Sequence, residues 1–224
     1  MKRYYHGTLP SYNHLMQPEN PYFNNTPDFL SLSKDFPSLL PFIGRNSDNS
    51  VFYTWSAPNS VKSCSFPSLI IRELTKALMK RDFHLDWDMP SSPLCPGLPG
   101  RINYLNWIHD VLCLHEKYAH ADSSSLLGFD VGTGASCIYP LLGNALYHWK
   151  FVATDIDEES IASANRLVEK NHLESEITVK QRTPSQPLLK DVVDFASNEV
   201  AFCVCNPPFF ANEAEVVQYG RNDV

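Results

Sequence analysis

The stretch that decides the fold is residues 126–136, which read LLGFDVGTGAS. Its first half is an apolar run typical of a buried strand, and its second half places Gly132 and Gly134 ahead of a helix-compatible segment. Glycine allows a positive φ and lets a ligand approach the backbone closely. A glycine turn between a strand and a helix is the geometry of a nucleotide site in an open α/β sheet. The sequence therefore predicts such a site at this turn.

A second apolar run, residues 150–155 with the sequence KFVATD, ends in Asp155. This acid lies about 20 residues beyond the glycines, where nucleotide-binding folds place a carboxylate against ribose hydroxyls. A dinucleotide fingerprint would need a third glycine where this chain has Cys137. The pattern favours a ligand that has a ribose but no phosphate, such as S-adenosylmethionine.

Near the C-terminus, residues 202–210 read FCVCNPPFF. The prolines after Asn206 fix φ and lack an N–H, so the carbonyls at this strand end remain as acceptors for an amino group. Phe209 suits stacking on a flat ring. The alternative interpretation is a rigid Pro-Pro turn with an aromatic plug, since proline often ends strands.

Longer stretches resemble the methyltransferase-like protein 16 family. They are TPDF at 26–29, RINYLNWI at 101–108, VGTGASCIYPLLG at 131–143 and CVCNPPFFAN at 203–212. Members of this family are RNA adenine-N6 methyltransferases, with U6 small nuclear RNA as the best-known substrate class, and their bacterial relatives act on ribosomal RNA. The resemblance runs from about residue 20 to the end of the chain.

The resemblance implies a class I S-adenosylmethionine-dependent methyltransferase, an α/β fold with a Rossmann-like parallel sheet. It implies S-adenosylmethionine as cofactor, a structured RNA similar to U6 small nuclear RNA as partner, and no metal. It also implies the nucleus as the location, with the cytoplasm as the alternative. The oligomeric state stays open.

Four residues are predicted to be catalytic: Asn206, Pro207, Pro208 and Phe209. An adenine amino group is a poor nucleophile because its lone pair is delocalised into the ring. The Asn206 side-chain oxygen and the Pro207 carbonyl would hold both hydrogens and expose that lone pair, while Phe209 stacks on the base. Most of the catalysis is then alignment of the transfer, on a base that is unpaired or flipped out.

The resemblance also implies the cofactor-binding residues: Arg101, Asp130, Gly132, Gly134, Ser136, Asp155 and Asn206. In the family, the arginine at position 101 meets the carboxylate of the methionine moiety. Asp130 is expected to orient the turn or the cofactor's amino group. Ser136 is expected to cap the following helix, and only secondarily to contact the ligand.

The formal charge of −7 argues against nucleic-acid binding through overall charge, so an RNA contact needs a local patch. We expect that patch on a helix at 67–83, where four basic residues share one face: Arg72, Lys76, Lys80 and Arg81. The alternative is a solvated helix face. Residues 20–25 lack the basic side chains of the family, which predicts weaker RNA affinity there or stacking on aromatic rings.

We divide the chain into an extension at 1–60, partly disordered at 1–20, a helical segment at 61–125 that faces RNA and covers the cofactor, and the core at 126–224. The extension and the helical segment are expected to contain helices at 28–36, 67–83 and 102–119 and a loop at 90–100. In the core, strands at 126–131, 150–155, 176–181 and 200–205 alternate with helices at 137–147, 158–171 and 188–196. This alternation predicts a parallel sheet.

A class I methyltransferase has seven strands in the order 3-2-1-4-5-7-6, and four are recognisable here, with the fourth at an open edge. We expect a fragment, a product without its last strands, or a chain completed by a partner, so the activity of this chain stays open. Two alternatives remain: a protein glutamine methyltransferase, which often has Tyr where Phe209 stands, and an inactive RNA-binding module.

The six cysteines show no Cys-x-x-Cys pair, so we expect neither a disulfide framework nor a zinc site. Cys203 and Cys205 are expected on one face of a strand as small apolar residues. His109, His115 and His120 are interpreted as ordinary polar residues. The sequence predicts no signal peptide and no membrane span, hence a soluble intracellular protein.

Overall fold

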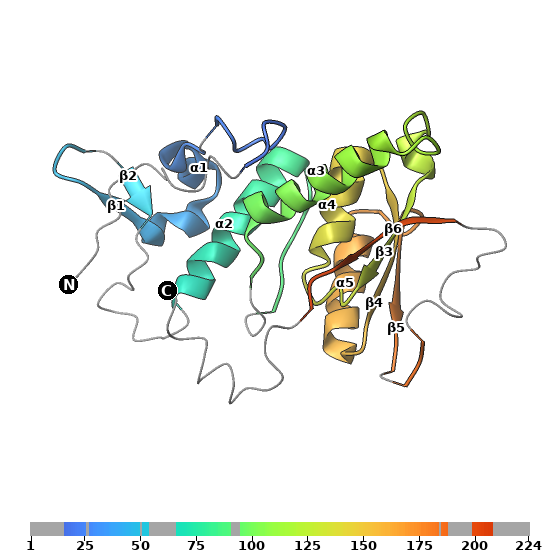
Figure 1. Ribbon diagram of the computed structural model, residues 1–224. Helices are drawn as coiled ribbons and strands as arrows, with labels where there is room; N and C mark the ends of the chain where they lie inside the picture. The colour runs from blue at the N-terminus through green and yellow to red at the C-terminus, as the bar shows by residue number, and fades with distance from the viewer. Residues whose placement is uncertain are drawn as a thin grey trace.

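The C-terminal half is built on a parallel four-stranded sheet with the order β5-β4-β3-β6 (Figure 1). Its strands are β3 (Leu127–Val131), β4 (Lys150–Asp155), β5 (Ile177–Gln181) and β6 (Val200–Cys205). The computed structural model describes residues 16–25, 27–49, 51–53, 66–90, 95–183, 185–187 and 199–207. The predicted α/β class and strand order are confirmed, and among the described strands β6 lies at the predicted edge.

Two helices cover one face of this sheet (Figure 1): α4 (Ile138–Tyr147) and α5 (Glu158–Lys170). α5 begins where the Asp157 carboxylate accepts the backbone N–H of Ser160 at 2.8 Å, an N-cap that satisfies an otherwise unpaired donor. Its apolar stripe, which includes Leu167 and Val168, is buried. α4 is buried along its first six residues, so it is the central helix of this layer. The predicted helix at 188–196 lies outside the described residues.

β6 carries a bulge where it joins the sheet. Leu127 pairs with Val200, but the next residue, Gly128, pairs with Phe202, so Ala201 is an extra residue on β6. Beyond this point Phe202 and Val204 pack in the helix-covered core, while Cys203 and Cys205 are exposed. The two cysteines thus lie on the same face of the strand, as predicted, and that face is exposed at both positions.

Helix α4 can approach the sheet because two glycines leave room for aromatic rings. A Cβ on Gly128 would lie 2.5 Å from the Phe202 ring and 2.7 Å from the Phe151 ring. A Cβ on Gly143 of α4 would meet the same Phe151 ring at 2.7 Å. Phe151 therefore fills the space between a strand glycine and a helix glycine, which explains a glycine within a helix.

The N-terminal half forms a second unit beside the sheet (Figure 1). It contains α1 (Phe29–Asp35), a 3-10 helix (Pro37–Phe42), a short antiparallel hairpin of β1 (Ile43–Arg45) and β2 (Val51–Tyr53), α2 (Phe66–Phe83) and α3 (Leu98–Leu114). A 3-10 turn, Ser123–Ser125, leads into β3. Among the described residues, no helix is long and apolar enough to cross a bilayer.

Two sequence predictions for this half are wrong in detail. The stretch 90–100 was expected to be a loop and the next helix to cover 102–119, but α3 already begins at Leu98 and ends at Leu114. Pro99 stands in its first turn, where a missing N–H costs nothing.

Of the two aromatic rings at 20–25, Tyr22 is not available for stacking on a base, because it is 5% exposed and its hydroxyl donates to Asp82 at 2.8 Å. Phe23 is half-buried, and stacking by this ring remains a prediction.

Residues 84–90, here called the strap, connect the N-terminal unit to the sheet layer. The Asn171 side chain at the end of α5 accepts the N–H of Asp86 at 2.7 Å and donates to its carbonyl at 2.9 Å. Trp87 is 1% exposed, and its indole N–H donates to the carbonyl of Ser136 at 2.9 Å. From the other side, Arg72 of α2 donates to the carbonyl of Met89. The strap thus fastens α2 to both α5 and the turn after β3.

We expect Gly128→Ala to lower the free energy of unfolding by about 1–3 kcal/mol, because the added methyl group would press on two buried rings. Chemical denaturation followed by circular dichroism measures this change. The matched control is Gly100→Ala in the first turn of α3, where a Cβ meets nothing within 4 Å. That variant should be neutral or slightly more stable; equal stability of both variants would contradict the close packing at Gly128.

Candidate active site

The carboxyl ends of three strands bring the predicted site residues together. Val131 pairs with Thr154 on one side and with Cys205 on the other. At these strand ends lie the glycine turn after β3, Asp155 as the last residue of β4, and Asn206 directly after β6. Ligands in open α/β folds bind at this edge of the sheet.

The turn after β3 is held by the end of β4. The N–H groups of Gly132 and Thr133 both donate to the carbonyl of Thr154 at 2.9 Å. Gly132 has φ 74° and Gly134 has φ 63°, values that strain any residue with a side chain. A Cβ at either position would meet nothing within 4 Å, so both glycines border open space in which a ligand can lie against the backbone.

Asp155 makes more contacts with the protein than the sequence indicated. One carboxylate oxygen accepts the N–H of Gly134 at 2.8 Å, and the other accepts the N–H groups of Ile156 and Asp157 at 2.8 and 3.0 Å. The side chain therefore links the glycine turn to the start of α5. Each carboxylate oxygen has two acceptor positions, so a further contact to a ligand hydroxyl is compatible with these bonds.

Asp130 is 1% exposed, and neither of its carboxylate oxygens has a hydrogen-bond partner among the described residues. Burial raises the pKa of this carboxyl from 3.8 to about 7. The nearby Thr133 hydroxyl and Arg101 lower that pKa, and the charge of Asp155 raises it. A buried carboxylate without a donor is costly, so a positively charged or N–H-bearing ligand group fits this position.

Arg101 reaches the site from the first turn of α3. Its guanidinium donates to the Tyr139 hydroxyl at 2.6 Å and lies 5.4 Å from the centre of that ring. Tyr104, one turn along α3, packs edge-on against Tyr139 at 5.5 Å. These two tyrosines were not predicted as site residues, although both lie in the quoted runs RINY and CIYP. Tyr139 thus holds the arginine and Tyr104 supports Tyr139, while the charge of Arg101 lowers the pKa of Asp130.

Ser136 does not cap the following helix, contrary to the sequence prediction. The N-cap of α4 is Cys137, a buried residue in the left-handed conformation that makes no side-chain cap bond. Ser136 instead offers its carbonyl to Trp87 of the strap. A contact of its side chain with a ligand remains a prediction.

The predicted catalytic residues are described only in part. Asn206 is half-buried and Pro207 is exposed, both directly after β6. Pro208 and Phe209 lie outside the described residues. Within the described ranges, no group of three His, Cys, Asp or Glu side chains is placed to hold a metal ion.

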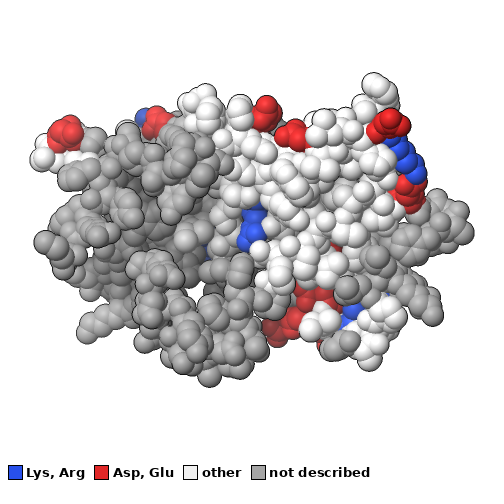
Figure 2. All heavy atoms as spheres, in the orientation of Figure 1, with Lys and Arg blue, Asp and Glu red and all other residues white. Residues whose placement is uncertain are grey.

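The predicted basic stripe on α2 is paired with carboxylates of the same chain. Lys76 contacts Asp88 at 3.3 Å and Lys80 contacts Asp86 at 2.8 Å, in exposed ion pairs. Arg81 binds both carboxylate oxygens of Asp82, at 2.5 and 2.8 Å. Over the described residues in Figure 2, basic atoms form small separate groups rather than a continuous band.

Comparisons with known proteins cover almost the whole chain. A family model described as RNA methyltransferase matches residues 11–223. The U6 small nuclear RNA (adenine-(43)-N(6))-methyltransferase of Caenorhabditis elegans is 38% identical over 89% of this chain and 39% of its own length. Human METTL16 is 37% identical over 89% and 33%. The ribosomal RNA large subunit methyltransferase F of Flavobacterium johnsoniae is 35% identical over 84% and 57%.

Solved structures show the same fold. The human METTL16 catalytic domain in complex with MAT2A 3′UTR hairpin 1 has a TM-score of 0.75 at 34% identity, covering 93% of this chain and 64% of that one. The N-terminal domain of human METTL16 in complex with SAH has a TM-score of 0.71 at 35% identity, covering 88% and 71%. The chain spans about two fifths or less of the full length of the eukaryotic relatives above.

We expect Asp130 to make the stability of the protein pH-dependent. Its pKa is about 7 in the folded state against 3.8 for a carboxyl that is not buried, so the folded protein binds more protons between these limits. Stability should therefore fall as the pH rises from about 4 to about 7. Asp130→Asn keeps the shape without the charge and should be more stable than the wild type above pH 7, by at most about 4 kcal/mol at about 1.4 kcal/mol per pH unit.

Thermal unfolding from pH 4 to pH 8 tests this expectation. The control is Glu116→Gln, at an exposed position just beyond α3, which should follow the wild-type curve. Parallel curves for the wild type and Asp130→Asn would show that the buried carboxyl does not titrate in this range.

Proposed function

Because the chain belongs to the RNA methyltransferase family, we propose that it binds S-adenosylmethionine and transfers a methyl group to the exocyclic amino nitrogen of an adenine in a structured RNA. The observation that supports this most is the buried, unpartnered Asp130 carboxylate beside an open glycine turn. On the neighbouring strand end, Asn206 and Pro207 supply acceptors for an amino group.

The residues at the turn fit the amino-acid part of S-adenosylmethionine. Its ammonium group would supply the donors that the Asp130 oxygens lack. Its carboxylate would suit the Arg101 guanidinium, which α3 brings to the same place. Asp155 remains the proposed ribose contact. When bound, the cofactor supplies an electrophilic methyl group carried on a sulfonium.

The proposed work of the protein in the transfer is alignment. The Asn206 side-chain oxygen and the Pro207 carbonyl would each accept one hydrogen of the adenine amino group, which turns its lone pair toward the methyl carbon. The proposed stacking partner is Phe209, from the same NPPF motif. Because the amino group must be presented outside a base pair, the target adenine would be unpaired or flipped out.

The proposed substrate is an RNA similar to U6 small nuclear RNA, and the proposed location is the nucleus. The first rests on the relatives, one of which is a U6 small nuclear RNA methyltransferase and another of which was solved with an RNA hairpin. The proposed location in the nucleus follows from that substrate class.

Transfer of a radiolabelled methyl group from S-adenosylmethionine tests the proposal. Label should enter an RNA hairpin with an unpaired adenine, and should not enter a peptide with a central glutamine or a hairpin with guanine at the same place. Label in the peptide would favour a protein glutamine methyltransferase instead. If the protein binds S-adenosylmethionine and RNA but no label enters the hairpins or the peptide, the chain would be identified as an RNA-binding module.

We expect Asn206→Ala to lower the methylation rate about 10²-fold or more, by analogy with the loss of a single aligned hydrogen bond in other active sites. Its affinity for S-adenosylhomocysteine, measured by calorimetry, should change much less, since Asp130, Arg101 and the glycine turn remain. Asn165→Ala on α5 is the matched control and should keep both values. Full activity of Asn206→Ala would refute the amino-nitrogen mechanism.

A further inference from the structure

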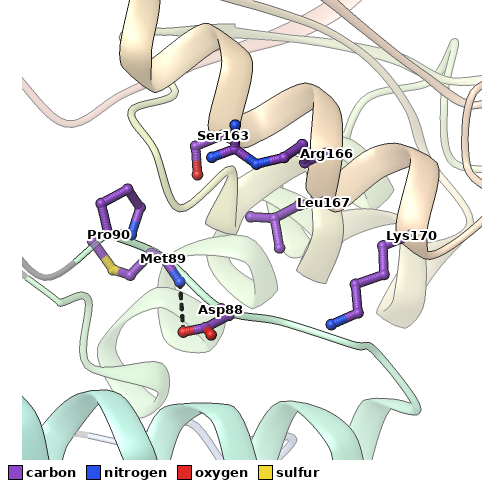
Figure 3. A pocket seen from close by; sticks show the side chains of 7 residues that line it. All are labelled: Asp88, Met89, Pro90, Ser163, Arg166, Leu167 and Lys170. Atoms are coloured by element: carbon purple, nitrogen blue, oxygen red, sulfur yellow. Dashed lines mark hydrogen bonds between the residues drawn. The ribbon is translucent and has the colours of Figure 1, made fainter.

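A groove lies between the strap and α5, apart from the proposed amino-group acceptors (Figure 3). Its volume is about 420 Å³. One wall is the strap from Asp88 to Pro90, and the other is the face of α5 that carries Ser163, Arg166, Leu167 and Lys170. Met89 and Leu167 give it an apolar floor, and both are buried.

The α5 wall carries two cations that form no ion pair within the described residues. Arg166 and Lys170 are exposed and lie one helical turn apart on the same face. Within the described part of the chain, neither forms a hydrogen bond or an ion pair, and Lys170 is felt only at longer range by Asp86 of the strap, whose pKa it helps to lower. In Figure 3, the Lys170 side chain extends toward the strap. In a protein with a net charge of −7, two unpaired cations lining one groove indicate an anionic ligand.

Helix α2 adds two further cations, and the ion pairs that they form with the strap contribute little stability. Lys76 and Lys80 of α2 pair with Asp88 and Asp86 of the strap, with side chains that are 43–50% exposed. Exposed ion pairs of this kind are worth about 0–1 kcal/mol, so a phosphate can replace a carboxylate at little cost. The groove itself is lined by two cations, Arg166 and Lys170, and one carboxylate, Asp88, whose partner on α2 is Lys76.

We propose that this groove binds the sugar-phosphate backbone of the RNA. The inference rests on the proposed function and adds a second contact surface away from Asn206. An arginine fork and a lysine suit phosphate oxygens, and the apolar floor suits the faces of the riboses between them. The two cations of each helix are one turn apart, about 5.4 Å, so each row can serve successive phosphates of one strand. Arg81 is not part of this surface, because Asp82 occupies its guanidinium.

The test measures binding of a fluorescent RNA hairpin with a loop adenine across a salt series. Arg166→Gln/Lys170→Gln should weaken binding roughly tenfold at low salt. It should also make the plot of log affinity against log salt shallower by between one and two, since each phosphate contact contributes about 0.7–0.9 to that slope. Its melting temperature and its affinity for S-adenosylhomocysteine should match the wild type.

Two further variants make the test specific. Lys34→Gln/Lys150→Gln changes the net charge equally at exposed positions of α1 and β4 and should retain wild-type affinity. Asp88→Asn removes the carboxylate from the groove wall and should tighten binding several-fold. Equal affinity and slope for Arg166→Gln/Lys170→Gln and its control would overturn the groove proposal alone. Absence of RNA binding by the wild-type protein would overturn the proposed RNA substrate together with it.

Discussion

The glycine turn depends on the end of β4, and most of the site depends on the turn. The Thr154 carbonyl and the Asp155 carboxylate together accept three of its backbone N–H groups. These bonds stabilise positive φ angles at Gly132 and Gly134, and so fix where α4 begins. They also determine where Asp130 lies, buried beneath the turn with its oxygens unpaired. A buried polar group without a hydrogen-bond partner is typical of a site that binds a ligand.

The strap gives this turn a second support, from outside the sheet. Trp87 fills a buried position and bonds the Ser136 carbonyl, while Asn171 binds both backbone groups of Asp86. A side-chain amide that satisfies a backbone N–H and a carbonyl at once replaces a missing strand partner for an irregular segment. The N-terminal unit is thereby joined to the turn through buried and hydrogen-bonded contacts rather than through a flexible linker.

The sequence predicted the sheet well, because each strand is a short apolar run that ends at a turn signal and alternates with a helix. It also predicted the strand order and the residues that meet at the carboxyl edge. The ties of the strap were not foreseeable, because Asn171 and Asp86 are 85 residues apart and neither has a distinctive pattern around it. The hydrogen bond between Asp155 and the glycine turn was not foreseeable either, because it depends on the tertiary structure.

Two local errors have physical causes. Pro99 and Gly100 looked like loop residues, but both stand in the first turn of α3, where helix N–H groups have no intrahelical partner anyway. The hairpin of β1 and β2 was missed because each strand has only three residues, too few for an alternating pattern to be visible.

The bulge at Ala201 sets which way Asn206 faces. In a strand, successive side chains point to opposite sides, so one residue more or fewer turns every later side chain over. With the extra residue, Phe202 enters the gap left by Gly128 and the strand continues in that phase to its end. The number of residues between the bulge and Asn206 therefore determines which side of the sheet Asn206 faces. Deleting Ala201 would leave the composition of β6 almost unchanged, yet it would set Phe202 and the acceptors beyond it against the wrong side of the sheet.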